Sequence, residues 1–185
     1  WLYSSGSTGQ PKGVAHVHSA LRATSDTYGK QVLEIEEDDV VFSAAKFFFA
    51  YGLGNAMTFP LSVGATTLLF GGRPTPDEMV KTLTAERPTI FCGVPTLYAA
   101  MVAHMDKSGP LDAPLRTCIS AGEALPEEVG TRWERHTGCS ILDGVGSTEL
   151  LHIFLSNRKD DLVYGTSGIA VPGYALRLVN EFGEE

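Results

Sequence analysis

Short apolar runs alternate with longer segments of helical periodicity along most of this chain. The runs predict buried strands at 39–44, 65–70, 89–94, 116–120 and 140–143. Helices are predicted between them at 18–29, 55–61, 75–87, 95–105 and 126–136. Strands that alternate with helices are typical of a mostly parallel sheet. The pattern therefore predicts an α/β fold in which mostly parallel sheet layers are flanked by helices.

Several local signals refine these predicted elements. Thr75 is expected to cap a helix, with Pro76 in its first turn and Glu78 closing a capping box. Gly29 is expected to stop the first long helix. The apolar run 47–49 is expected to lie in the core. Two short strands are predicted at 1–4 and 14–17, on either side of a polar loop.

That polar loop, 3–13, has the composition of a polyphosphate site. It carries four hydroxyl side chains between Ser4 and Thr8, three glycines, and Lys12 near its end. Successive backbone amides in a glycine-rich turn form an anion-binding concavity, and hydroxyls add donors. A flexible linker is disfavoured because Pro11-Lys12-Gly13 leads directly into an apolar run. The P-loop of nucleotide hydrolases is rejected because Gly13 stands where that motif needs a hydroxyl.

Composition limits the classes of partner. The chain has 185 residues, 43% hydrophobic and 19% charged, so it can bury a core. Its net charge of −8 argues against nucleic acid and against an anionic membrane surface. The cysteines, Cys92, Cys118 and Cys139, are expected to be buried thiols in a cytoplasmic protein. The chain opens on Trp1 without a signal peptide, and we expect it to be an internal piece of a longer protein.

Two further turns follow predicted strands, where such folds bind ligands. The turn 120–126 is rich in small residues and precedes a helix, although an ordinary capping turn would look the same. The turn 143–149 offers the Thr148 hydroxyl and the Glu149 carboxylate, a hard ligand suited to Mg²⁺. Asp143 is equally well interpreted as an acceptor for an adenine amino group or as an acid at a strand end.

The run from Ser5 to Gly13, followed by Gly146-Ser147-Thr148-Glu149, resembles the motifs of the adenylate-forming enzymes. The resemblance implies ATP, Mg²⁺ and an α/β fold. It implies that Thr148 holds the α-phosphate, that Glu149 holds the metal, and that Lys12 acts with them in catalysis. Val145 stands where the family usually has an aromatic ring. The implied nucleotide-binding residues are Ser5, Gly6, Ser7, Thr8, Gly9, Lys12, Gly122, Glu123, Ala124, Asp143, Gly144, Val145, Gly146 and Thr148.

Two segments, 48–55 and 146–154, resemble the aryl-CoA ligases within that family. The resemblance implies that an aromatic acid is surrounded by Ala50, Tyr51, Gly146, His152 and Ile153. The turn 47–54 contains no acidic residue, so a buried substrate ammonium would lack a partner and an amino-acid substrate is disfavoured.

The implied reaction is activation of benzoate, or of a close analogue such as hydroxy- or aminobenzoate, and transfer to coenzyme A. We expect residues 1–185 to be a fragment of the AMP-binding (adenylation) domain without the C-terminal lid domain. A non-catalytic nucleotide-binding module remains the alternative from another class. His16, His18, His104 and His136 give no functional signal.

Overall fold

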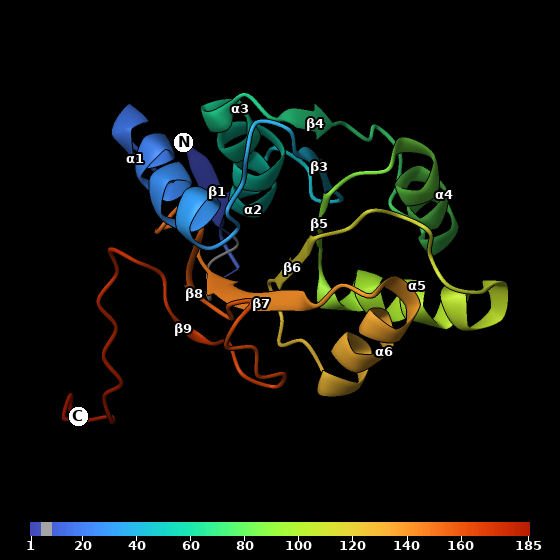
Figure 1. Cartoon of the computed structure of the whole chain (residues 1–185). Helices are drawn as coiled ribbons and strands as arrows, with labels where there is room; N and C mark the ends of the chain where they lie inside the picture. Colours follow the sequence, from blue (N-terminus) through green and yellow to red (C-terminus); the bar gives the residue numbers. More distant parts are fainter. Residues whose placement is uncertain (5–8) are drawn as a thin grey trace.

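A seven-stranded sheet forms the centre of the chain in a computed structural model that describes residues 1–4 and 9–185 (Figure 1). The strand order is β4-β3-β5-β6-β7-β8-β9. Pairing is parallel from β4 to β7 and antiparallel from β7 to β9. The strands are β3 (Val40–Ser43), β4 (Thr66–Leu68), β5 (Ile90–Gly93), β6 (Thr117–Ala121), β7 (Ile141–Gly146), β8 (Ile153–Ser156) and β9 (Ile169–Ala170). The predicted mostly parallel α/β fold is confirmed.

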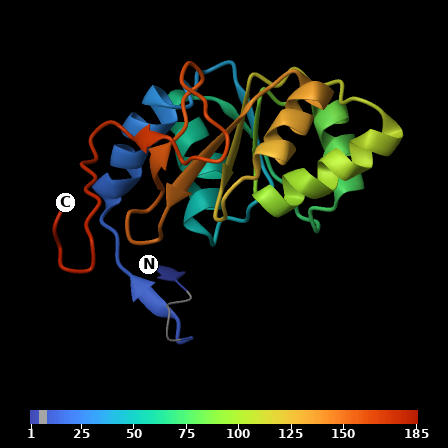
Figure 2. The ribbon, with the colours of Figure 1, turned by 90° about the horizontal axis from the view of Figure 1, so that it is seen from below.

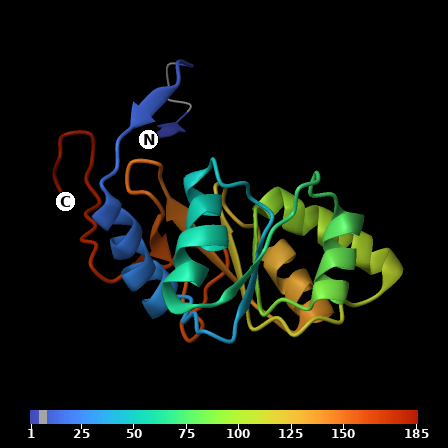
Figure 3. The same ribbon diagram turned by 90° about the horizontal axis from the view of Figure 1, so that it is seen from above.

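Helices cover both faces of this sheet, as Figures 2 and 3 show from opposite sides. One face carries α1 (His18–Thr24), which continues into the π-helical segment η1 (Ser25–Gly29). The same face carries α2 (Ala50–Leu53), η2 (Gly54–Thr58) and α3 (Phe59–Val63), which follow one another without a break. The other face carries α4 (Pro76–Glu86), α5 (Pro95–Ser108) and α6 (Glu127–Thr137).

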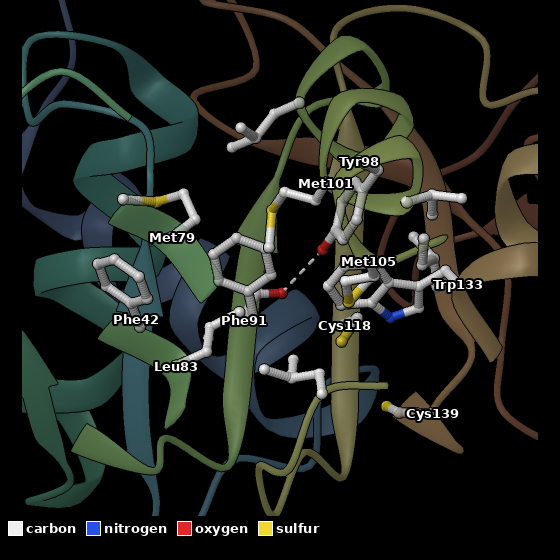
Figure 4. Close-up of a cluster of buried hydrophobic side chains, with 14 of the residues drawn as sticks. Phe42, Met79, Leu83, Phe91, Tyr98, Met101, Met105, Cys118, Trp133 and Cys139 are labelled. Atoms are coloured by element: carbon white, nitrogen blue, oxygen red, sulfur yellow. Dashed lines mark hydrogen bonds between the residues drawn. The ribbon is translucent and has the colours of Figure 1, made fainter. Parts of the chain in front are cut away.

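Alternate residues of the central strands supply two separate cores, because successive side chains of a strand point to opposite faces. In β5, Phe91 packs with the α4–α6 side, whereas its neighbours Ile90 and Cys92 pack with the opposite side. Figure 4 shows the first core, where Trp133 of α6 lies among Tyr98, Met105 and Cys118. The strands are thus buried on both faces, which explains their continuous apolar sequence.

The predicted start of α4 is confirmed in part. The Thr75 side chain accepts a hydrogen bond from the Glu78 amide at 3.4 Å, as an N-cap should. The Thr75 amide, however, donates to the Arg73 carbonyl, so the reciprocal half of a capping box is taken by the backbone. A single cap is therefore sufficient to begin this helix.

Three predicted boundaries are wrong. β2 covers Lys12–Val14 and not 14–17, because it pairs with β1 (Leu2–Ser4) in an antiparallel hairpin. The helix after β3 begins at Ala50 and not at residue 55. Gly29 does not stop its helix, since residues 30 and 31 remain helical. A Cβ at Gly29 would lie 3.2 Å from the Phe59 ring, so this glycine allows two helical segments to pack closely.

The predicted burial of 47–49 is also wrong. Phe47, Phe48 and Phe49 are 40%, 69% and 57% exposed, on the loop between β3 and α2. The pattern could not separate an apolar loop from an apolar strand, because both are short runs. Strands β8 and β9 were not predicted, since their pairing depends on a sharp turn after β7.

Cys92, Cys118 and Cys139 are buried free thiols, as predicted. Within residues 1–4 and 9–185, no helix combines the length and the apolar composition that crossing a membrane requires.

Candidate active site

A cavity of about 740 Å³ opens at the carboxyl ends of the parallel strands. Residues from the ends of β5, β6 and β7, from the start of α2 and from the start of β8 line it. The structure brings together in this cavity all residues predicted to surround an aromatic acid, hereafter the acid pocket: Ala50, Tyr51, Gly146, His152 and Ile153. Gly122 and Thr148, predicted to bind nucleotide, line the same cavity.

Tyr51 forms a fixed wall of the acid pocket. It lies in the first turn of α2, and its hydroxyl lies 2.9 Å from the Gly93 carbonyl and 3.0 Å from the Ile119 carbonyl. Both carbonyls accept from the phenol, because a carbonyl has no proton to donate. Burial raises the pKa of Tyr51 well above its ordinary value, so the phenol stays protonated. The ring is consequently held against the ends of two strands.

His152 is buried among aromatic rings and has no hydrogen-bond partner for either ring nitrogen in the described part of the chain. It stacks on Tyr51 at 5.8 Å between centroids, and Phe59 meets it edge-on at 4.5 Å. Burial lowers the pKa of His152 to about 3, so the imidazole is neutral at physiological pH. A neutral ring with unpartnered nitrogens gives the acid pocket a polar group without a charge.

Two glycines in this region are required by close packing. A Cβ at Gly54 would lie 2.4 Å from Cδ2 of His152, far inside van der Waals contact. A Cβ at Gly146 would lie 2.9 Å from the His152 carbonyl, at the irregularity where β7 leaves its register with β8. Gly144, predicted to bind nucleotide, is buried, and a Cβ there would lie 2.8 Å from the Leu155 carbonyl.

The segment 147–152 is a tight turn that presents Thr148 and Glu149. The Leu150 amide donates to Ser147 Oγ at 3.1 Å, and the Leu151 amide donates to the Thr148 carbonyl at 3.2 Å. Leu151 has a φ of 68°, in the left-handed region that a leucine seldom occupies. The turn reverses the chain into β8 and leaves Glu149 exposed at its tip.

The structure brings Glu149 together with the hairpin that flanks the polyphosphate loop. The pKa of Glu149 is lowered by its own backbone amide, by the Ser147 and Ser4 hydroxyls, and by the positive charge of Lys12. Ser4 and Lys12 are partners across the β1–β2 hairpin. His16, two residues after this hairpin, has its Nε2 2.8 Å from the Thr148 carbonyl, so the two predicted phosphate-binding segments lie next to each other although they are far apart in sequence.

The turn predicted to lie along adenine joins β6 to α6. Gly122 has a φ of 99°, and Glu123 and Ala124 are exposed. Asp143 lies behind this turn and accepts a hydrogen bond from the Leu125 amide at 3.4 Å, while its other carboxylate oxygen has no partner among the described residues. Burial raises the pKa of Asp143. Val145 is 40% exposed at the end of β7.

The predicted phosphate loop is described at its end. Ser5, Gly6, Ser7 and Thr8 lie outside the described residues, so their predicted role stays a prediction. Gly9 has a φ of 76°, which favours glycine, and Lys12 is exposed in β2.

Sequence reasoning missed two residues near the site. His16 Nε2 lies 2.8 Å from the Thr148 carbonyl, across 132 positions of the chain. Asn55 is 1% exposed, and neither amide atom has a partner in the described part of the chain. No local motif distinguishes His16 from the other histidines. Asn55 was predicted to begin a helix, and its place one turn after Tyr51 in a continuous helix could have indicated it.

The family model described as "AMP-binding enzyme" matches residues 1–185. The chain belongs to the AMP-binding enzyme family. Among relatives of this AMP-binding protein is a benzoate–CoA ligase of Thauera aromatica, which is 60% identical. The match covers the whole of this chain and 35% of the length of that ligase. A 4-hydroxybenzoate–CoA/benzoate–CoA ligase of Rhodopseudomonas palustris is 52% identical, over the whole chain and 34% of its own length.

Solved structures of family members agree with this fold. A benzoate CoA ligase from Burkholderia xenovorans LB400 superposes with a TM-score of 0.93 at 55% identity, covering 100% of this chain and 37% of that one. An anthranilate CoA ligase in complex with anthranoyl-AMP superposes with a TM-score of 0.93 at 43% identity, covering 99% and 36%. The AMP-binding chain described here thus spans about a third of the length of these relatives.

Proposed function

We propose that a protein built on this chain activates an aromatic carboxylic acid, benzoate or a close analogue, with ATP and then transfers the acyl group to coenzyme A. The observation that carries the proposal is the single cavity that joins the acid pocket to Gly122 and Thr148. An acid at Tyr51 and a nucleotide at these turns would lie side by side. Relatives named as benzoate–CoA ligases support the same reaction.

The lining of the cavity supports an uncharged aromatic group beyond the carboxylate. Its described lining is largely apolar and contains no aspartate or glutamate. A substrate ammonium would therefore be buried without a partner. An unpaired buried charge costs on the order of several kcal/mol. Neutral His152 and the Tyr51 ring offer flat surfaces to an aromatic acid. Benzoate meets these conditions, whereas an amino acid does not.

In the first half-reaction, a carboxylate oxygen of the acid attacks the α-phosphorus of ATP. A new oxygen–phosphorus bond forms, the bond to the bridging oxygen breaks, and pyrophosphate leaves. The residues serve by positioning and by neutralising charge, and no nucleophilic side chain is required. Thr148 would bind the α-phosphate, and Lys12, with Ser5, Ser7 and Thr8, would bind the outer phosphates.

Glu149 fits the role of a protein ligand in a magnesium site whose other ligands are phosphate oxygens of ATP. Among the described residues, no three His, Cys, Asp or Glu side chains form a cluster that could hold a metal. Magnesium at a nucleotide is commonly held by one or two carboxylates together with phosphate oxygens. The lowered pKa of Glu149 keeps this carboxylate ionised. The ion would supply charge neutralisation on the phosphates.

In the second half-reaction, the thiol of coenzyme A attacks the acyl carbon of the adenylate and a carbon–sulfur bond forms. The bond from that carbon to the phosphate oxygen breaks, AMP leaves with the bonding electrons, and the thiol proton passes to solvent. The proposal of coenzyme A as acceptor is supported by the relatives, which are named as CoA ligases.

A substituted benzoate is the second candidate substrate, favoured by the unpartnered nitrogens of His152. A hydroxyl or amino group on the aromatic ring could exchange a hydrogen bond with the neutral imidazole. The relatives named for 4-hydroxybenzoate and for anthranilate are consistent with this candidate.

The test is ATP–pyrophosphate exchange with a full-length protein that carries this chain. We expect exchange to depend on an added acid and to be stimulated by benzoate or by its hydroxy and amino derivatives. Alanine and phenylalanine should not support exchange. Phosphate release without an acid, or exchange that prefers an amino acid, would overturn the proposal.

A further inference from the structure

His16 connects the two halves of the proposed phosphate site. It lies on the segment between β2 and α1, is half-buried, and its Nε2 is 2.8 Å from the Thr148 carbonyl. Because a carbonyl oxygen can only accept, Nε2 must carry the proton of this hydrogen bond. The bond is therefore a donation from the hairpin segment to the turn that presents Glu149.

The turn that receives this bond is already folded by its own contacts. The Thr148 carbonyl also accepts from the Leu151 amide, and Ser147 Oγ accepts from the Leu150 amide. These bonds fix the shape of the turn but not its place relative to the hairpin. The His16 bond comes from outside the turn and supplies that placement.

The hairpin needs such a connection. β1 and β2 form a sheet of their own, which is not hydrogen-bonded into the seven-stranded sheet. Figures 2 and 3 show the hairpin projecting from the body of the fold, next to the loop between β7 and β8. The charge of Lys12 nevertheless acts on Glu149. The Ser4 hydroxyl of β1 also lowers the pKa of Glu149, so the distance between Lys12 and Glu149 depends on contacts between the two segments, and the His16 bond is one of these contacts.

We infer that His16 is a positioning residue, which holds the Lys12 hairpin against the Thr148–Glu149 turn so that both can bind one nucleotide. The inference rests on the proposed function, because it assigns both segments to ATP. It predicts a larger effect on ATP than on the acid. The His16 bond ends on Thr148, whereas Tyr51 is held by the Gly93 and Ile119 carbonyls and His152 by packing against Phe59.

The experiment compares three variants in a full-length protein that carries this chain. H16A removes the donor. H16Q keeps a donor N–H at a similar distance from the backbone, and H104A changes a half-buried histidine of α5 as a control. Steady-state kinetics give KM for ATP and for benzoate, and calorimetric titration gives the Kd for MgATP without any acid.

We expect H16A to raise KM and Kd for ATP about 3- to 10-fold, the effect of one lost hydrogen bond. KM for benzoate should stay within about twofold, H16Q should restore most of the ATP affinity, and H104A should resemble the unchanged protein. Equal losses for ATP and benzoate, an unchanged Kd for ATP, or a glutamine variant no better than alanine would each overturn the inference.

Measurements on the unchanged protein distinguish failure of the His16 role from failure of the proposed function. If it binds MgATP with H16A weakened but shows no acid-dependent exchange, the proposed function fails and the positioning role stands. If it binds no nucleotide, both fail.

Discussion

The two edges of the parallel sheet, at the amino and the carboxyl ends of its strands, differ in the hydrogen bonding of their buried polar groups. At the amino-terminal edge, Asp39 is 3% exposed and accepts hydrogen bonds from Arg116 at 2.7 Å and from Thr89 at 2.6 Å, so its carboxylate is satisfied within the fold. At the carboxyl-terminal edge, buried polar atoms of Ser120, Asp143 and His152 lack partners among the described residues.

This difference separates a structural edge from a binding edge. A buried polar group without a partner costs about 1–3 kcal/mol, so folded proteins leave few of them. The Asp39 network is explained by folding alone. Of the unpartnered groups at the carboxyl edge, His152 lines the cavity, where a ligand could complete its hydrogen bonds, and Ser120 and Asp143 lie in the strands β6 and β7 that end at the cavity.

The largest effect is expected from D39A, which removes the centre of the satisfied edge. Arg116 would lose its carboxylate partner but is partly exposed and keeps its hydrogen bonds to the Leu33 and Glu34 carbonyls, so we expect a loss of about 2–3 kcal/mol, within the range for hydrogen bonds to a charged group. The apparent Tm should fall by about 2–4 °C per kcal/mol. KM for ATP and for benzoate should stay nearly constant. D106A is the matched control, since it breaks an ion pair with Arg132 that is partly exposed on the α5–α6 surface.

The pH dependence of the Asp39 network follows from its ionisation. Burial alone would raise the pKa of Asp39, but hydrogen bonds from Arg116 and Thr89 outweigh it and lower that pKa below 3.8. The stability that ionised Asp39 contributes is complete above the ordinary pKa of 3.8, and it is lost as the pH falls through the lower pKa of the folded state. The difference in Tm between the unchanged protein and D39A should therefore become smaller below about pH 4. A difference that widens in acid would contradict the assignment.

G54A tests the packing of the binding edge. The new methyl group would overlap His152, and overpacking of this kind costs about 1–3 kcal/mol. If His152 moves to relieve the overlap, KM for benzoate should rise about tenfold or more, while KM for ATP changes little. G71A is the control, because a Cβ at that exposed glycine meets open space. Equal effects of the two variants on benzoate would contradict the role of His152.

Y51A tests the wall of the acid pocket. Loss of the ring should raise KM for benzoate about tenfold, and KM for ATP should stay within about twofold. Y51F keeps the ring but loses the donor to the Gly93 and Ile119 carbonyls, so its effect should be smaller, about 1 kcal/mol. Steady-state kinetics of both variants measure the split. Equal loss of acid and ATP binding in Y51A would refute the pocket assignment.

The buried His152 also predicts a slope in stability with pH. His152 is neutral in the fold down to about pH 3, whereas the unfolded chain binds a proton below 6.5. The unfolded state then holds more protons, so stability should fall as pH decreases from 6.5 toward 3, by at most about 1.4 kcal/mol per unit. H152L should reduce this slope in thermal unfolding between about pH 7 and pH 5. An unchanged slope would show that the imidazole is not buried neutral.

The sequence predicted the parts of this fold that depend on local patterns. Apolar runs such as 89–94 and the cap at Thr75 were recognised because their neighbours in sequence decide them. Phe47 to Phe49 were assigned to the core, and β8 was missed, because burial and antiparallel return depend on distant segments. His16 could not be identified for the same reason, since its partner lies 132 positions away.

Sequence motifs predicted the site residues, and the structure shows which neighbouring residues hold them in place. The resemblance named Tyr51 and His152, and both line one cavity. The resemblance did not assign a role to Gly54, which leaves space for the His152 ring. Gly54 lies within the segment 48–55 that carries the resemblance, but its contact with the distant His152 ring appears only in the folded chain.

The most direct test is a crystal structure of a full-length protein carrying this chain, bound to a stable analogue of benzoyl-adenylate. We expect the aromatic ring of the analogue to pack against Tyr51 and His152, its phosphate to lie at Thr148, and Lys12 and Glu149 to lie on the same side of that phosphate. An analogue bound away from the carboxyl edge, or a phosphate that faces away from both Lys12 and Glu149, would contradict it.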